Sequence, residues 1–305
     1  MVGRVIEISD PLVSLSLLRG FMLVKISGEE KARIPLADID ILILNGSGSV
    51  LTTNLLNQLL ENGVMVIVLG SNYLPSGIFY PTNPHFLHKQ KINLQIQAAK
   101  PLNKRLWQAV VKEKILNQAA ILSFFGGAKE KQLLELARKV SSGDKENLEA
   151  QAARKYWQRL FGTEFRRDYS SQGINSLLNY GYAVLRAATA RAVFAVGLHP
   201  AIGIHHSNQE NAFCLVDDLM EPFRPIVDFL VRKLVEKEEK IEELNPEMKK
   251  FLTKILTLDL STAAGTTPIS NCLLRLAQSL VRSLEEGEMK LEFPLSPMPM
   301  ELEIS

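Results

Sequence analysis

The hydrophobic residues of this chain change their spacing around residues 80–84, and that change constrains the fold more than any other feature. Before it, short runs of Val, Ile, Leu and Phe are separated by turn formers at intervals of roughly 8–12 residues, which favours antiparallel strands in a sandwich. After it, apolar residues recur with the period of a helix. Pro81 and Pro84 block regular structure at the boundary and indicate a linker. We therefore predict an α+β protein.

Four segments follow from this boundary. We expect a β-sandwich-like domain over 1–80, a linker over 81–90, a larger all-α catalytic domain over 91–290 and a loosely ordered tail over 291–305. The first domain has no histidine or cysteine, so we interpret it as a scaffold or dimerisation surface. Inside it, leucines at helical spacing predict one helix that ends at Asn62-Gly63, followed by a buried strand.

Composition narrows the class of protein. The 305 residues include two cysteines, Cys214 and Cys272, which are too few for a disulfide framework and favour a reducing compartment. The N-terminus lacks the basic and apolar regions of a signal peptide, and no apolar run reaches the roughly 18 residues that span a bilayer. We expect a cytoplasmic protein with no membrane partner.

Charge is distributed unevenly, although the formal net charge is only +2. Residues 81–139 contain eleven Lys and Arg against three acids, and residues 149–209 contain seven against three. Acids gather instead near the C-terminus. A basic middle suits a polyanionic partner, and the alternative is a set of solvated helix faces.

One predicted helix is buried and yet carries arginines. Residues 174–196 are alanine-rich and apolar on nearly every side, as in the middle of a bundle. Arg186 and Arg191 lie on this helix. A buried arginine must pair with an acid or face a charged ligand. An earlier helix is predicted to end at Gly126, and another to begin after Asp144 as its N-cap.

Residues 197–225 concentrate side chains that can bind metals. They contain three of the chain's five histidines and the acids Asp218 and Glu221, whose spacing puts both on one face of a helix. Pro222 marks a helix irregularity at the same point. Together with Glu149, which is flanked by small alanines, these residues predict a site of carboxylates and an imidazole that suits Mg²⁺ or Mn²⁺.

Arginines near these acids support this interpretation, because a site that holds metal and phosphate needs both signs of charge. The set consists of Arg154, Arg159, Arg166, Arg167, Arg186 and Arg191. In the alternative interpretation, the same acids and arginines are ion pairs that close the helical bundle.

Four motifs stand in order along the helical part. They are E-A-x-A-A-R-x-Y-W at Glu149–Trp157, N-x-L-L-N-Y-G-Y at Asn175–Tyr182, G-L-x-P-x-x-G-x-x-H at Gly197–His206 and D-L-M-E-x-F-R-P at Asp218–Pro225. The set resembles the signatures of the CRISPR-associated spacer integrases, the Cas protein-one family, and looks most like its type II branch. The resemblance covers essentially the whole chain, because the β-rich start and the helical remainder match the family's two-domain plan.

The resemblance implies a set of metal ligands. These are Glu149, His206 and Glu221, with Asp218 as an additional supporting acid. His205 is adjacent to His206, and the motif separates the two by a single position in favour of His206. His199 stands where the family often has Asp. We expect His199 and His205 to be neighbours of the site rather than ligands.

The resemblance also implies an activity and partners. The 3′-hydroxyl of a short DNA fragment attacks a phosphodiester in a CRISPR array, with Mg²⁺ or Mn²⁺ as cofactor, and the same site cleaves DNA as an endonuclease. Implied partners are double-stranded DNA, a second copy of the chain in a homodimer, a small partner protein that bridges two dimers and the type II effector nuclease. The candidates for DNA contact are Arg154, Arg166, Arg167, Arg186 and Arg191.

Two other functions fit the residue pattern without the resemblance. One is a non-catalytic DNA-binding scaffold, in which the acids and arginines are structural ion pairs. The other is a metal-dependent hydrolase of small phosphoesters. The first question for the structure is whether Glu149, His206 and Glu221 converge.

Overall fold

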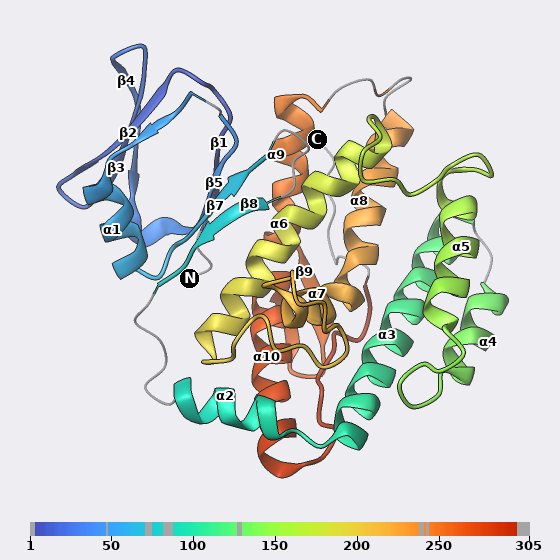
Figure 1. The fold of residues 1–305 in the computed structure, drawn as a ribbon. Coiled ribbons are helices and arrows are strands. Elements are labelled where there is room, and N and C mark those ends of the chain that lie inside the picture. Colours follow the sequence, from blue (N-terminus) through green and yellow to red (C-terminus); the bar gives the residue numbers. More distant parts are fainter. Residues whose placement is uncertain are drawn as a thin grey trace. The chain divides into compact units, whose positions relative to one another are not determined.

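The computed structural model describes residues 4–46, 48–70, 75–81, 88–126, 130–237, 241 and 244–297. The chain divides into two compact units, Met1–Pro84 and His85–Ser305. The first unit is rich in strands and the second in helices (Figure 1), which confirms the predicted α+β fold. Among the helices described, none combines the length and the hydrophobicity needed to cross a membrane.

Two sheets and one helix make up the first unit. The first sheet has the order β1-β5-β7-β8, formed by Arg4–Ile8, Ile39–Leu44, Met65–Leu69 and Pro75–Phe79. The second has the order β4-β3-β2-β6, formed by Glu29–Pro35, Phe21–Ile26, Val13–Leu18 and Val50–Leu51. Helix α1 is Thr53–Glu61, and a short turn, η1, is Leu36–Asp38. Buried side chains from both sheets and from α1 form one core, including Leu15, Met22, Leu42, Leu59 and Val66.

The predicted strand direction is wrong for part of this unit. Strands β1, β5 and β7 pair in parallel, as do β2 and β6, whereas β2-β3-β4 and β7-β8 are antiparallel. Between β5 and β7 the chain returns through α1, and a crossover of this kind brings the next strand back in the same direction. Apolar spacing predicts a strand but not its direction. The predicted helix, its end at Asn62-Gly63 and the buried strand that follows are confirmed.

The second unit is built from helices of very different lengths. They are α2 (His88–Gln97), α3 (Lys100–Gly126), α4 (Lys131–Lys139), α5 (Leu148–Phe161), α6 (Ile174–Ala195), α7 (Cys214–Met220), α8 (Arg224–Lys237), α9 (Pro246–Thr253) and α10 (Ile269–Glu286), with the short turns η2 (Glu221–Phe223) and η3 (Lys254–Thr257). Of the predicted linker, residues 82–87 lie outside the described part of the chain, and 88–90 belong to α2.

Helix α6 is the buried helix that the sequence predicts. It packs against α7, α8, α9 and α10 (Figure 1), and most of its side chains are buried. Its Arg186 pairs with Asp217 through two contacts, Nε to Oδ1 at 2.7 Å and Nη2 to Oδ2 at 2.8 Å. An arginine on a buried helix is expected to pair with an acid, and Arg186 meets this expectation.

Two features of the second unit differ from the predictions. A hairpin, β9 (Asp259–Thr262) with β10 (Gly265–Pro268), interrupts the domain predicted to be all-α. Residues 291–297 of the predicted loose tail are tied to the unit, because Glu292 N donates to Ser279 Oγ at 3.0 Å and Leu295 N donates to the Ser261 carbonyl at 2.8 Å. Residues 298–305 lie outside the described part of the chain.

Candidate active site

Glu149 is held at the first turn of α5 by hydrogen bonds to the helix start. The N-cap residue is Asn147, whose side chain accepts a bond from Ala150 N. Asp144, which the sequence predicted to be the cap, instead accepts from Leu148 N at 2.9 Å and from Glu149 N at 3.0 Å. Two residues therefore satisfy the free N–H groups of this turn and fix the direction in which Glu149 leaves the helix.

Glu221 lies at a break between two helices. Helix α7 ends at Met220, Glu221 begins the turn η2, and α8 starts at Arg224. Pro222 has no N–H to donate to the carbonyl four residues back, so the helix cannot continue regularly through this point. The Pro222 carbonyl accepts a bond from Asn117 Nδ2 of α3 at 2.8 Å. The break is thus attached to α3, and it presents Glu221 towards that helix.

Lys114 of α3 joins the two glutamates. Its Nζ lies 2.6 Å from Glu149 Oε1 and 2.5 Å from Glu221 Oε2. The contact with Glu221 lacks hydrogen-bond geometry, and among the residues that the structure describes Glu221 Oε2 has no hydrogen-bond partner. The other oxygen of Glu221, Oε1, lies 2.7 Å from Arg224 Nε. The two acids therefore converge, with positive charge between and beside them.

This arrangement changes the protonation of the groups involved. Burial opposes the charged form of Glu221, but Arg224 and Lys114 outweigh it and lower the pKa of Glu221 to about 2. Burial also opposes the charge of Lys114, yet Glu221 and Glu149 raise its pKa above the ordinary value. At neutral pH Glu221 and Lys114 are therefore both charged.

Lys114 is not among the residues predicted from the sequence, although the sequence contains a signal for it. Lys114 lies seven residues after Trp107 and three after Val111, which places it on the apolar stripe of α3. A lysine on a buried stripe needs an acid partner. The same reasoning that was applied to Arg186 would have found it.

His206 and Asp218 form a second pair of the predicted site residues. The Asp218 carboxylate has no exposed surface, and its Oδ2 accepts from Ile204 N at 2.8 Å and from His205 N at 3.0 Å. Its Oδ1 lies 2.5 Å from His206 Nδ1. This contact favours the neutral tautomer with the proton on Nδ1, which leaves the Nε2 lone pair of His206 available. The hydrogen bond to Asp218 raises the pKa of His206.

Gly203 is required at the start of this loop. A Cβ atom there would lie 2.4 Å from the His206 carbonyl oxygen and 2.8 Å from Asp218 Oδ2. Both distances are far below an ordinary contact, so a side chain would displace the loop from the buried carboxylate.

The two adjacent histidines have different environments. The His205 ring stacks on Trp107 with a centroid distance of 4.2 Å, and burial lowers its pKa. The His206 ring meets Trp107 edge-on at 5.5 Å. His199 lies apart from both, with its Nδ1 accepting from Ala201 N at 3.3 Å. Of the three, His206 is the one that combines a buried carboxylate on one nitrogen with a second nitrogen able to bind a cation.

The residues of this site fit a hard divalent cation by their chemistry. Within the described ranges, no three His, Cys, Asp or Glu side chains lie close enough together to hold an ion as they stand, and Lys114 Nζ contacts both glutamates. Glu149 and Glu221 nevertheless both act on His206 and raise its pKa. Carboxylate oxygens with one imidazole suit Mg²⁺ or Mn²⁺. Glu221 Oε2 is buried and has no hydrogen-bond partner in the described part of the chain.

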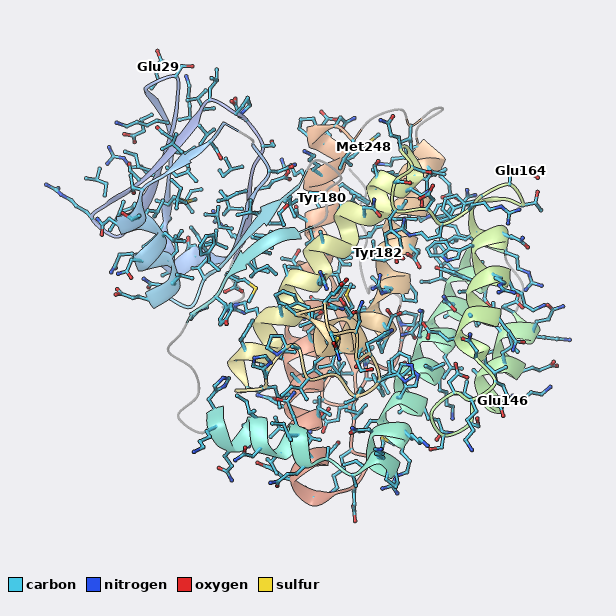
Figure 2. The ribbon with its side chains drawn as sticks, viewed as in Figure 1. Glu29, Glu146, Glu164, Tyr180, Tyr182 and Met248 are labelled. Carbon is cyan, nitrogen blue, oxygen red and sulfur yellow. The ribbon has the colours of Figure 1, made fainter. Side chains whose placement is uncertain are left out.

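A cavity of about 190 Å³ adjoins the two glutamates. It is lined from α3, α5, α6 and α8, and it receives the guanidinium groups of Arg167 and Arg224. Asn175 and Asn179 hold Arg167, accepting from Nη1 at 2.9 Å and from Nη2 at 2.6 Å. Tyr182, labelled on α6 in Figure 2, donates a hydrogen bond to Asp228 of α8 at the same cavity.

The other predicted arginines lie in varied settings. Arg154 and Arg166 are exposed, and Arg159 pairs with Glu130. Arg186 is engaged with Asp217, and Arg191 is half-buried. Arg167 is therefore the member of the predicted set that reaches the cavity beside Glu149 and Glu221, and Arg224 joins it there.

Comparison with known proteins assigns the family. The model of a family described as "CRISPR associated protein Cas1" matches residues 8–249. The chain belongs to the Cas1 family. The predicted family is confirmed. The CRISPR-associated endonuclease Cas1 of Neisseria meningitidis serogroup C (strain 8013) is 40% identical over 248 residues, which cover 81% of this chain and 81% of that protein.

More distant members and solved structures agree with this family. A CRISPR-associated endonuclease Cas1 of Saccharolobus solfataricus is 29% identical over 222 residues, covering 69% of this chain and 68% of that protein. A casposase bound to an integration product has a TM-score of 0.81 and 21% identity, covering 100% of this chain and 96% of that chain. A Cas1 protein from Thermotoga maritima has a TM-score of 0.76 and 18% identity, covering 94% and 99%. At these identities the two structures show the shared fold.

Proposed function

We propose that this protein is a divalent-metal-dependent DNA integrase and endonuclease. It inserts short DNA fragments into a CRISPR array by attack of a DNA 3′-hydroxyl on a phosphodiester. The observation that carries the proposal is the convergence of Glu149 of α5 and Glu221 of the break between α7 and α8 on one cavity that also receives Arg167 and Arg224. Its support also includes membership of the Cas1 family, a relative named as an endonuclease and the fold shared with a casposase bound to an integration product.

Three side chains would hold the metal. They are the carboxylates of Glu149 and Glu221 and the Nε2 atom of His206. Asp218 supports them, since a carboxylate on the other ring nitrogen orients a histidine ligand and makes it more basic. When bound, Mg²⁺ or Mn²⁺ would lower the pKa of the attacking hydroxyl or water and would neutralise charge on the phosphodiester.

The remaining residues bind and orient the DNA. Arg167 and Arg224 line the cavity beside the two glutamates, where a guanidinium can take two phosphate oxygens at once. Asn175 and Asn179 hold the guanidinium of Arg167 in place before DNA binds, so little side-chain entropy is lost when it binds a phosphate. Trp107 stacks on His205 and thereby limits the movement of the neighbouring His206.

Partners and location follow from the same proposal. The basic segment 81–139 and the exposed Arg154 and Arg166 would track the phosphates of double-stranded DNA, with Arg186 and Arg191 as further candidates. The protein would act in the cytoplasm as a homodimer, with a small partner protein and the type II effector nuclease. Solved structures titled as Cas6-RT-Cas1–Cas2 complexes share the fold, which supports assembly with other Cas proteins.

The ion pairs of Lys114 favour a second candidate, a DNA-binding scaffold without catalysis. In that case Glu149 and Glu221 exist to neutralise a buried lysine, and no metal is needed. The two candidates differ in what removal of an acid does. A catalytic acid is needed for strand transfer even in a stable protein, whereas a structural acid matters through stability alone.

A strand-transfer assay on a supercoiled plasmid that carries the cognate array tests the proposal. The substrate is a short duplex with 3′-hydroxyl ends, with Mn²⁺, Mg²⁺ or EDTA. We expect Glu149→Gln, His206→Ala and Glu221→Gln each to abolish product while DNA binding persists, and Glu164→Gln to behave as wild type, since Glu164 (Figure 2) is exposed after α5. Product in EDTA, or activity retained in two of the three variants, would overturn the proposal. Cleavage of a generic phosphodiester with no DNA preference would favour a small-substrate hydrolase.

A further inference from the structure

Lys114 occupies the position in which the two acidic side chains meet. Its side chain is 11% exposed, against 25% for Glu149 and 8% for Glu221. One ammonium group is within 2.6 Å of an oxygen from each acid. Two carboxylates this close would repel each other without a cation, so Lys114 stabilises their convergence.

The two acids depend on Lys114 to different degrees. Glu221 also has Arg224, which approaches its other oxygen at 2.7 Å. For Glu149, the side-chain partner that the structure describes is Lys114. Lys114 is thus the group that couples the first helical turn of α5 to the break between α7 and α8.

We propose that Lys114 is an internal cation that assembles Glu149 and Glu221 before a divalent metal binds, and that it competes with the metal for the same oxygens. This inference rests on the proposed function, because it assumes that the two acids are metal ligands. Glu149 Oε1 and Glu221 Oε2 cannot face an ammonium and a metal ion at the same point, because two positive charges would then lie a few ångströms apart.

The Lys114 ammonium group has space to move into when it leaves the two carboxylates. Lys114 is among the residues that line the cavity of about 190 Å³, and its flexible four-carbon stem lets the ammonium turn into that space. The cavity is where the proposed function puts phosphate, so the displaced charge would face an anion. Lys114 is therefore a positioning residue for the acids, and its position depends on whether metal is bound.

The test compares Lys114→Met, which keeps the stem but removes the charge, with Lys155→Met at an exposed position of α5. Binding of Mn²⁺ alone is measured by calorimetry, and melting is measured with and without Mn²⁺. We expect K114M to bind Mn²⁺ about tenfold more tightly than wild type. Without metal it should melt at a lower temperature than wild type, and added Mn²⁺ should raise its melting temperature by more. K155M should match wild type in all three measurements.

Several results would overturn this inference. Equal or weaker Mn²⁺ binding by K114M would show that Lys114 does not compete with the metal, and unchanged melting without metal would show that it does not assemble the acids. If K114M does not fold, Lys114→Gln is measured in the same way. If K114M and K114Q fold only when Mn²⁺ is present, the inference is supported. If neither variant folds even with Mn²⁺, the inference is wrong. Wild type that binds no Mn²⁺ would instead refute the proposed metal site, and this outcome is separate from the others.

Discussion

His206 Nδ1 lies 2.5 Å from Oδ1 of Asp218, a carboxylate with no exposed surface. Asp218 also accepts bonds from the backbone of Ile204 and His205, so it fixes both the loop and the imidazole ring. A buried acid in this position has two effects on His206. It holds the ring so that Nε2 carries the lone pair, and it raises the pKa of the ring.

Asp218→Asn should therefore weaken the site and change its pH dependence. The amide keeps an acceptor for the backbone bonds but loses the charge, and we expect activity to fall by about 10–100-fold. Protonated His206 cannot bind a cation, so Mn²⁺ binding is lost as pH falls through the pKa of the ring. Since Asp218 raises that pKa, the loss should move to lower pH in D218N. Mn²⁺ titrations across pH measure this, and a move to higher pH would contradict it.

Glu221→Gln should destabilise the protein in metal-free buffer at neutral pH. The pKa of Glu221 is lowered from 4.5 to about 2, so its ion pairs contribute stability above about pH 4.5, and that stability is lost as pH falls towards 2. We expect the free energy of unfolding to fall by about 3 kcal/mol at pH 7, and this loss should become smaller at lower pH. Urea unfolding in EDTA at pH 7 and pH 3 measures both values. An equal loss at the two pH values would be evidence against the ionic origin of the effect.

Asp228→Asn should remove a pH dependence of stability whose sign is opposite to that of Glu221. Burial raises the pKa of Asp228 from 3.8 to about 7, although the Tyr182 hydroxyl opposes part of that change. The native state holds this proton more tightly than the unfolded chain, so stability is full below about pH 3.8 and declines as pH rises through about 7. As pH rises from 5 to 8, the free energy of unfolding of D228N should increase by about 2–4 kcal/mol relative to that of wild type. Unfolding free energies at the two pH values test this, and parallel curves would refute it.

Arg167→Ala should weaken DNA binding in a salt-dependent way. If the guanidinium contacts one phosphate, its removal should lower the slope of log affinity against log salt by about 1. The matched control is Arg33→Ala, because Arg33 is an exposed arginine of the first unit paired with Glu30. Fluorescence anisotropy with a short duplex at several salt concentrations gives the slopes. An unchanged slope for R167A would remove Arg167 from the DNA-binding surface.

Local sequence signals predicted much of the helical unit. Residues 174–196 were expected to form a buried helix, and α6 is Ile174–Ala195. A helix end was expected at Gly126, and α3 is Lys100–Gly126. Such features depend on a few adjacent residues. The direction of β1, β5 and β7 does not, and it was predicted wrongly because the route of the chain between strands sets it.

The sequence by itself determined the family and supplied the candidate site residues. Acids, histidines and arginines in four ordered motifs were enough to predict the family, and the comparisons confirm it. Only the tertiary structure decided which charges meet. Lys114 and Glu149 are 35 residues apart in the sequence, and their ammonium and carboxylate groups are 2.6 Å apart in space. Coulomb energy depends on that spatial distance and on burial, and folding sets both.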